Sequence, residues 1–451
     1  MPTSNRAKRV LKWIAGIAAV VLINSLLCFV LVPYGSKSEI MWHDYRQAKD
    51  LDTVILGTSL VERSVNPYTL DEALGSNSFN MATPSQSLED TYLGIEQAIK
   101  DHDLKRVIMG VEFADLNRKS EQKTGVFVAE KTKGESLPEA LHDWTTSIDA
   151  DTWLWSPQAF SILFFPWQIQ HVSAKDLVAN VKMRFDGSTI YEAAEMNEPG
   201  WKYVGKGFGG IEGVYKYAAK PSSYYVNYGE LEGVTEFDPE RMAVLERICS
   251  LCAENGVQLV MYVIPYADFN IVSFGDNYQV LSDQLAAFAQ EHGARYYDFN
   301  LARPELFDSK DSYYEDAQHM NIDGANALSA SLAKLLAMLD AGEDVSGLFE
   351  TYAERCARVE GVASACLMPV VSIGDALVMH AESVVGPTSE AEYRFSIAPA
   401  NSKDYQVVQD WSPTPDCTYA PGKKGNYKIR LEVRAKGQEK PKVTTTQTFA
   451  F

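Results

Sequence analysis

One segment restricts the architecture of this chain more than any other. Residues 13–32 read WIAGIAAVVLINSLLCFVLV, twenty residues without a charge. As a helix, a segment of this length spans the ~30 Å hydrocarbon core of a bilayer. The residues just before it include four cations: Arg6, Lys8, Arg9 and Lys12. The positive-inside tendency therefore predicts a cytoplasmic tail at 1–12, a signal-anchor helix at 13–33, and a chain that lies outside the cell from there on.

A cleaved signal peptide is the alternative for this segment. However, the apolar run is longer than the usual h-region of about 7–15 residues, and no A-x-A cleavage site follows it. We therefore predict a single-pass protein of the cell membrane, with its N-terminus in the cytoplasm and its folded domains outside.

The composition of the whole chain limits its partners. Of 451 residues, 46% are hydrophobic and 22% are charged, which is typical of globular proteins and excludes disorder. A net charge of −19 would repel the phosphates of DNA or RNA, so we expect no nucleic-acid partner. The six cysteines lack the clustering of a zinc site, and we expect neither a metal nor an organic cofactor.

Residues 34–341 alternate short apolar runs with amphipathic segments. Strands are predicted at 53–56, 78–82, 106–111, 257–265 and 294–299. Helices are predicted between and after them, at 67–73, 87–100, 239–254, 279–291 and 322–340. This alternation predicts an α/β domain with a parallel sheet that is covered by helices on both faces.

Two regions depart from this rhythm. Residues 118–235 contain the aromatic-rich stretch 152–171 and a Gly/Tyr-rich stretch after it. They are either an inserted subdomain whose aromatics pack on the main core, a lid near the active site, or a surface that rests on the bilayer or on a membrane partner. After residue 347, segments 427–435 and 443–451 alternate apolar and polar residues with period two, which predicts a small antiparallel β-sandwich at 349–451.

A small-residue turn, Gly57-Thr58-Ser59-Leu60, follows the first predicted strand. In a parallel sheet, ligand sites lie beyond the carboxyl ends of the strands. A serine there is near a helix N-terminus, whose amides favour an alkoxide or oxyanion. Because serines at such turns are commonly only N-caps, Ser59 needs a second observation to be a candidate nucleophile.

The second observation lies before the last predicted helix. A catalytic serine needs a general base, and the base needs an orienting carboxylate. Among the seven histidines, only His319 has an aspartate, Asp316, three residues before it. This spacing lets the carboxylate reach Nδ1 while Nε2 faces the serine. We therefore predict a Ser-His-Asp triad of Ser59, His319 and Asp316.

These residues resemble the SGNH (GDSL-like) hydrolases. The turn at 57–60 resembles their G-D-S-L block with Thr58 in place of Asp, and Asp316 with His319 resembles their terminal D-x-x-H block. The resemblance covers about residues 50–341 and implies a flavodoxin-like, three-layer fold. In this family the oxyanion is held by the serine amide, by a backbone amide of a second block and by an Asn side chain of a third.

The second and third blocks are less alike. The second resembles FNMATPSQSLED, where Asn80 ends a strand and Ser85 stands where a glycine is usual. The third should read G-x-N-D, but this chain has Gly110-Val111-Glu112-Phe113. The resemblance thus implies an oxyanion and substrate side of the site made from Gly57, Asn80, Ser85 and Glu112, without the asparagine.

A membrane-anchored branch of the family has a similarly degenerate third block. It includes D-alanine transfer proteins of teichoic-acid modification and O-acetyl transfer proteins of polysaccharides. This resemblance implies a cell-envelope polysaccharide or teichoic-acid-like polymer as substrate and a membrane-bound acyl-transfer protein as partner. The C-terminal region resembles the triple-tyrosine type of Ig-like sandwich in its spaced aromatics: Tyr405, Trp411, Tyr419 and Tyr427.

Two classes of function are consistent with these observations. The first is a serine-dependent O-acyl esterase or acyltransferase of the cell envelope. The second is a catalytically inactive surface scaffold or glycan- or partner-binding protein that has kept the α/β shape. The triad residues favour the first class, whereas Thr58 and the missing asparagine favour the second.

Overall fold

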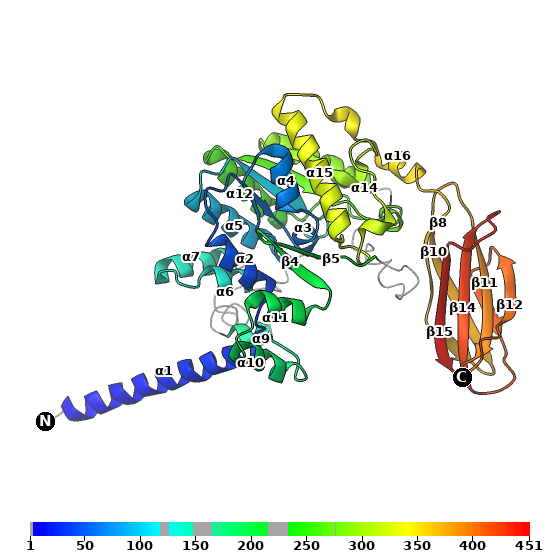
Figure 1. Cartoon of the computed structure of the whole chain (residues 1–451), viewed down its shortest axis with the longest axis horizontal. Coiled ribbons are helices and arrows are strands. Elements are labelled where there is room, and N and C mark those ends of the chain that lie inside the picture. Colours follow the sequence, from blue (N-terminus) through cyan, green and yellow to red (C-terminus); the bar gives the residue numbers. More distant parts are fainter. Residues whose placement is uncertain (1–2, 118–125, 148–164, 170, 215–232, 276) are drawn as a thin grey trace.

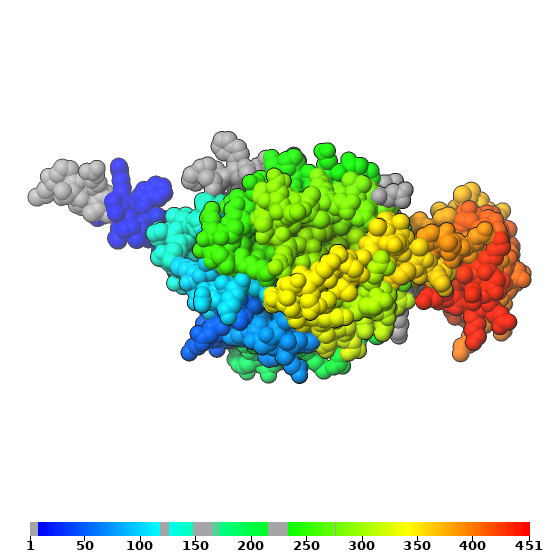
Figure 2. Space-filling view, turned by 90° about the horizontal axis from the view of Figure 1, so that it is seen from above, coloured from blue at the N-terminus to red at the C-terminus, as the bar shows by residue number. Residues whose placement is uncertain are grey.

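The computed structural model describes residues 3–117, 126–147, 165–169, 171–214, 233–275 and 277–451. Three parts follow one another along its long axis: a protruding N-terminal helix, a central α/β body and a β-sheet domain at the C-terminal end (Figure 1). In the space-filling view, the helix and the β-sheet domain lie at opposite ends of the body (Figure 2).

Helix α1 (Thr3–Leu31) contains the apolar segment identified in the sequence. Within Lys8–Leu31, the most apolar window of 18 residues has a mean hydropathy of 2.6 and is not buried inside the protein. Within the described residues this is the one helix long and apolar enough to cross a membrane, as an anchor or a signal sequence does. Its large side chains, such as Leu22 and Ile23, are exposed along its length.

The central body contains a five-stranded parallel sheet in the order β2-β1-β3-β6-β7. Its strands are β1 (Thr53–Leu56), β2 (Ser78–Asn80), β3 (Arg106–Val111), β6 (Gln258–Val263) and β7 (Arg295–Asp298). In register, Thr53 lies opposite both Ser78 and Arg106. The order is that of the flavodoxin-like doubly wound sheets. The predicted parallel sheet is therefore confirmed, and its central strands β1, β3 and β6 are mostly apolar because both faces are covered.

Helices cover both faces of this sheet. They are α4 (Pro67–Leu74), α5 (Leu88–Asp101), α12 (Pro239–Glu254), α14 (Asn277–Glu291) and α15 (Ile322–Asp340). Helix α15 packs against α4, and α12 packs against α5. Right-handed crossovers place α4 on the face opposite α5 and α12, because the chain reverses direction across the sheet after β2. The result is three layers with one continuous apolar core.

Local capping explains where these helices begin. Asn66 accepts a hydrogen bond from the Tyr68 N–H at the start of α4, and Pro67 is its first residue. The Asp238 side chain caps α12, and the Asn321 side chain accepts from the Gly324 N–H at the start of α15. Both α12 and α15 have the bounds that the sequence predicts.

The remaining helices of the body are shorter. Two lie between α1 and α4: α2 (Lys37–Tyr45) and α3 (Ser59–Glu62). Near the C-terminal end of the body are α13 (Asp268–Ile271) and α16 (Tyr352–Ala357), with 3-10 turns at Phe299–Leu301, Asp311–Tyr313 and Ser346–Leu348.

The region 118–235 is mostly helical where it is described. Its elements are α6 (Val126–Lys131), α7 (Leu137–Ser147), α9 (Pro166–Ile169), α10 (Leu177–Phe185), α11 (Ile190–Asn197) and the hairpin β4 (Trp201–Gly205) with β5 (Phe208–Ile211). Phe127 and Trp144 join the core of the central body. Most of the aromatic stretch 152–171, and the Gly/Tyr-rich residues 215–232, lie outside the described residues.

The C-terminal domain consists of two antiparallel sheets. One contains β8 (Val362–Leu367), β9 (Val371–Ile373), β10 (Ala376–Val385) and β13 (Asp416–Tyr419); the other contains β11 (Ala391–Pro399), β12 (Gln406–Ser412), β14 (Asn426–Ala435) and β15 (Val443–Ala450). Side chains of both sheets, such as Leu377 and Phe395, form one core. The strands predicted from the alternation at 427–435 and 443–451 are therefore present as β14 and β15.

Of the four spaced aromatics of this domain, Tyr419 and Tyr427 pack against its core, whereas Tyr405 and Trp411 lie against charged side chains. The Trp411 ring lies under the guanidinium groups of Arg394 and Arg434, at 4.9 and 4.1 Å from the ring centre. The guanidinium of Arg430 lies 3.6 Å from the centre of the Tyr405 ring. These rings therefore pack against charged side chains of the β11 and β14 strands.

Candidate active site

Three side chains that are far apart in the sequence meet at the carboxyl edge of the central sheet. His319 Nε2 lies 2.9 Å from Ser59 Oγ, and His319 Nδ1 lies 2.8 Å from Asp316 Oδ2. The serine and the histidine are 260 residues apart. The three predicted triad residues thus form a continuous hydrogen-bonded chain.

The position of Ser59 follows from the turn after β1. Gly57 has φ 147°, and a Cβ there would lie 2.4 Å from a Val61 methyl and 3.2 Å from the Gly110 carbonyl oxygen, so only glycine fits. Thr58 is the extended N-cap of α3, and its hydroxyl accepts from the Leu60 N–H at 3.3 Å. Ser59 is then the first residue of α3. Strands β2 and β3 flank β1, so this turn lies where the strand order reverses, the usual place for a ligand.

The loop before α15 holds His319 and Asp316 in place. One oxygen of Asp316 accepts the N–H groups of Gln318 (2.8 Å) and His319 (2.7 Å), and the other faces the imidazole. Partial burial acts to raise the pKa of Asp316, but the hydrogen bonds and charge of His319 outweigh it and hold that pKa well below its usual value. Asp316 is therefore ionised and can stabilise a protonated imidazole.

An ion-pair cluster joins the serine helix to the histidine loop. Arg63, one turn after Ser59 in α3, is 9% exposed and pairs with Glu315, the neighbour of Asp316, and with Glu198 at the end of α11. The N–H of Glu315 also donates to the His319 carbonyl at 3.0 Å. Arg63 therefore ties both halves of the site together, a contact that no sequence motif indicated.

The same cluster reaches the segment that follows the apolar helix. The Lys37 ammonium, at the start of α2, lies 3.2 Å from Glu62 and 2.9 Å from Glu198. It also lies 4.3 Å from the centre of the Trp201 ring in β4. Lys37 thus links the residues just after α1 to the helix that carries Ser59.

The residues expected on the oxyanion side have different surroundings. The buried Asn80 amide donates to the carbonyls of Val65 (2.9 Å) and Val61 (3.3 Å), and its oxygen accepts the Ala82 N–H (2.9 Å). These bonds hold the end of β2 against the segment after β1. The Asn80 side chain therefore stabilises the fold at this position. We therefore remove Asn80 from the substrate-binding set.

Ser85 and Glu112 do lie in the segments after β2 and β3. Ser85 has φ 53°, the left-handed conformation that explains why a glycine is usual in the resembling block. Glu112 accepts a hydrogen bond from the Thr58 hydroxyl, so it joins the end of β3 to the residue before Ser59. Thr58 and Glu112, two of the positions that depart from the resembling blocks, are therefore partners of each other.

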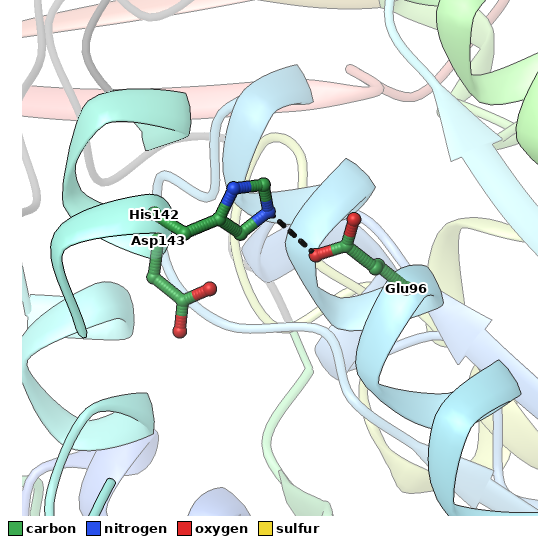
Figure 3. Close-up of side chains that lie close together, drawn as sticks. All are labelled: Glu96, His142 and Asp143. Carbon is green, nitrogen blue, oxygen red and sulfur yellow. Dashed lines mark hydrogen bonds and ion pairs between the residues drawn. The ribbon is translucent and has the colours of Figure 1, made fainter. Parts of the chain in front are cut away.

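Two groups of acidic and histidine side chains are close enough to be considered as metal sites. Glu315, Asp316 and His319 form one, but Arg63 and the imidazole already neutralise its carboxylates. Glu96, His142 and Asp143 form the other (Figure 3). There His142 Nε2 lies 3.2 Å from Glu96, whereas the Asp143 carboxylate pairs with the buried Lys131 ammonium. In each group a cationic side chain already engages one of the carboxylates: Arg63 pairs with Glu315, and Lys131 pairs with Asp143.

No family model matches this sequence, and neither does any curated protein. Among solved structures, the chain is similar to a GDSL-like lipase from Bacteroides thetaiotaomicron (7% identity, 68% of this chain and 99% of that one, TM-score 0.29). It is similar to the same degree to a candidate acylhydrolase from Bacteroides fragilis (7% identity, 67% and 97% coverage, TM-score 0.29). These likenesses are too low to establish a family.

Proposed function

We propose that this chain is a membrane-anchored serine O-acyl esterase or acyltransferase of the cell envelope. The observation that carries the proposal is the hydrogen-bonded chain from Ser59 through His319 to Asp316, at the point of the sheet where ligands usually bind. The substrate class is a cell-envelope polysaccharide or teichoic-acid-like polymer, and a membrane-bound acyl-transfer protein is the proposed partner.

The geometry supports a two-step acyl transfer. His319 Nε2 takes the proton of Ser59 as Oγ attacks the acyl carbon, and Asp316 stabilises the imidazolium that forms. Collapse of the tetrahedral intermediate breaks the ester C–O bond, and His319 returns the proton to the leaving alcohol. In the second step His319 takes a proton from water or from a sugar or polyol hydroxyl, whose oxygen attacks the acyl carbon. The bond from the acyl carbon to Ser59 Oγ then breaks, and His319 returns the proton to Oγ. Attack by water gives an esterase, and attack by a hydroxyl gives a transferase.

We assign stabilisation of the oxyanion to the backbone amides of Ser59 and Ser85. The absent asparagine is worth about 3 kcal/mol in comparable sites, so a slower enzyme, or one that uses an activated acyl donor, is expected. Glu112 stands in the block where the family has its asparagine, and its bond to Thr58 keeps that carboxylate engaged.

A catalytically inactive surface protein is the second candidate, and one observation favours it. A carboxylate at Glu112, next to the serine turn, disfavours a developing negative charge nearby. In this case the α/β body would act as a scaffold or a binding domain for a glycan or partner, with the triad geometry retained.

One experiment distinguishes the two candidates. The full chain in detergent or nanodiscs is assayed for hydrolysis of a chromogenic acetyl ester and for labelling by a fluorophosphonate. Ser59→Ala should abolish both, whereas Ser331→Ala on α15 should change neither. If Ser59→Ala keeps its activity, the proposal of a serine enzyme is contradicted. If the wild-type chain shows no ester hydrolysis, no fluorophosphonate labelling and no activity on acylated envelope polymer, the inactive scaffold is supported.

A further inference from the structure

Helices α9 and α10 enclose the outer end of the apolar helix α1. Trp167 of α9 donates its indole N–H to the Asn24 side chain of α1 at 2.9 Å. The Phe185 ring at the end of α10 packs edge-on against Phe29 of α1, with centroids 5.5 Å apart. We call α9 and α10 (Pro166–Ile169 and Leu177–Phe185) the collar.

The collar supplies hydrogen-bond donors to the end of α1. The last carbonyls of a helix have no partner within the helix. Here the Asn180 amide donates to the carbonyls of Val30 and Val32, both at 3.0 Å, and Arg184 donates to that of Val32 at 2.8 Å. These side chains replace water at the end of α1. That replacement is needed where the surroundings are lipid, because an unpaired carbonyl there costs several kcal/mol.

Helix α10 exposes two large apolar side chains and buries one polar side chain. Its polar Asn180 is buried against α1, together with Met183. Its apolar Val178 and Phe185 are 75% and 76% exposed, and the exposed Lys182 lies between them on the same stripe. Large apolar side chains that flank a lysine are typical of helices at a membrane interface, where the lysine reaches the headgroups.

The contacts with α1 also set the depth of the collar. Asn24 lies seven residues before Leu31, the end of α1, which corresponds to about 10 Å along a helix. Phe29 lies two residues before that end, or about 3 Å. Because Lys8–Leu31 is apolar and unburied, side chains in contact with Asn24 and Phe29 lie at the level of the acyl chains and headgroups once α1 spans a bilayer.

We propose that the collar lies in the outer leaflet of the membrane, with Val178 and Phe185 at the boundary between headgroups and acyl chains. This inference rests on the proposed anchoring of the chain by α1. It adds a second membrane contact that fixes the tilt and height of the α/β body. Because Lys37 joins the residues after α1 to the Ser59 helix, the collar also fixes the position of the candidate active site relative to the membrane.

The test is the environment of a fluorescent label in lipid. The full chain, in vesicles of phosphatidylcholine and phosphatidylglycerol, carries an NBD group on Val178→Cys or Phe185→Cys. Val20→Cys in α1 reports on the anchor, and Val280→Cys on α14, a valine 48% exposed, is the matched control. The unsubstituted chain, treated identically, gives the background from native cysteines.

We expect blue-shifted emission at 178 and 185, quenched by lipids that carry a spin label near the headgroup. Position 20 should be quenched by deeper labels, and position 280 should stay aqueous. If the labels at 178 and 185 emit as in water while the label at 20 contacts lipid, the membrane position of the collar is contradicted but the anchor is not. If all labels emit as in water, the proposed anchoring by α1 is contradicted as well. Blue-shifted emission at 178 and 185 that lipid quenchers do not reach means that protein covers this face, which also overturns the proposal.

Discussion

Within the described residues, two groups of three side chains combine a histidine with carboxylates, and in one of these groups the histidine meets a serine hydroxyl. At the sheet edge, backbone N–H groups fix Asp316, the carboxylate fixes His319, and the imidazole meets Ser59. Between α5 and α7, His142 is exposed and pairs with Glu96 alone, while Asp143 is neutralised by Lys131. A histidine next to carboxylates is therefore not sufficient to make a catalytic site. What matters is whether the fold orients the base and leaves its second nitrogen aimed at a reactive group.

The largest expected difference between the clusters concerns the two histidines. Without its base, His319→Ala should lose the acyl-release activity almost completely, by as much as about 10⁶-fold if the triad is fully active. His142→Ala should stay within a factor of two, because His142 contacts nothing in the site. Initial rates with the chromogenic ester measure the activity of both variants. Equal losses of activity in the two variants would contradict the assignment of His319 as the catalytic base.

The two aspartates should affect different properties. Asp316→Asn should lower kcat by about 10⁴-fold, because the imidazole loses its orienting charge. Asp143→Asn should leave kcat unchanged but lower the free energy of unfolding by about 3 kcal/mol, because Lys131 loses a buried partner. Denaturant unfolding and ester kinetics on the same samples separate the effects. A stability loss in Asp316→Asn as large as its activity loss would argue against a catalytic role.

Arg63 tests whether the ion-pair cluster positions the triad. Arg63→Met should lower kcat by roughly 10²-fold with a smaller change in KM, because a shift of about 1 Å between serine and base has effects of this size. Arg63→Lys, which keeps the charge, should recover part of the rate. If the two variants lose equal activity in proportion to their loss of stability, Arg63 has only a structural role.

The smallest expected effect concerns a carboxyl outside both clusters. Burial, and then the neighbouring charge of Glu89, raise the pKa of Asp90 to about 7. A raised carboxyl pKa means that the folded state holds the proton more tightly than the unfolded state. Stability therefore falls as the pH rises from 5 to 8, by about 2 kcal/mol from this group. Asp90→Asn should remove that part of the pH dependence of Tm. An unchanged pH profile would show that Asp90 has an ordinary pKa.

Several features of the fold were predictable because their signals are local. The apolar runs of β1 and β3 and the caps before α12 and α15 lie within a few residues of the elements that they define. The pairing of Asp316 with His319 is local too, since it needs only a three-residue step. In contrast, the sequence did not indicate that the Asn80 amide bonds the Val61 and Val65 carbonyls, because a motif position does not show which backbone groups a side chain meets.

The sequence by itself determined an apolar helix, an alternating α/β segment and a short list of polar residues that follow strands. These depend on periodicity, capping and turn chemistry between near neighbours. Only the tertiary structure decided that Arg63 joins Glu315 to Glu198, that Glu112 bonds Thr58, and that Asn180 closes the end of α1. Those contacts join segments tens to hundreds of residues apart, and their partners are selected by strand order and packing rather than by any local pattern.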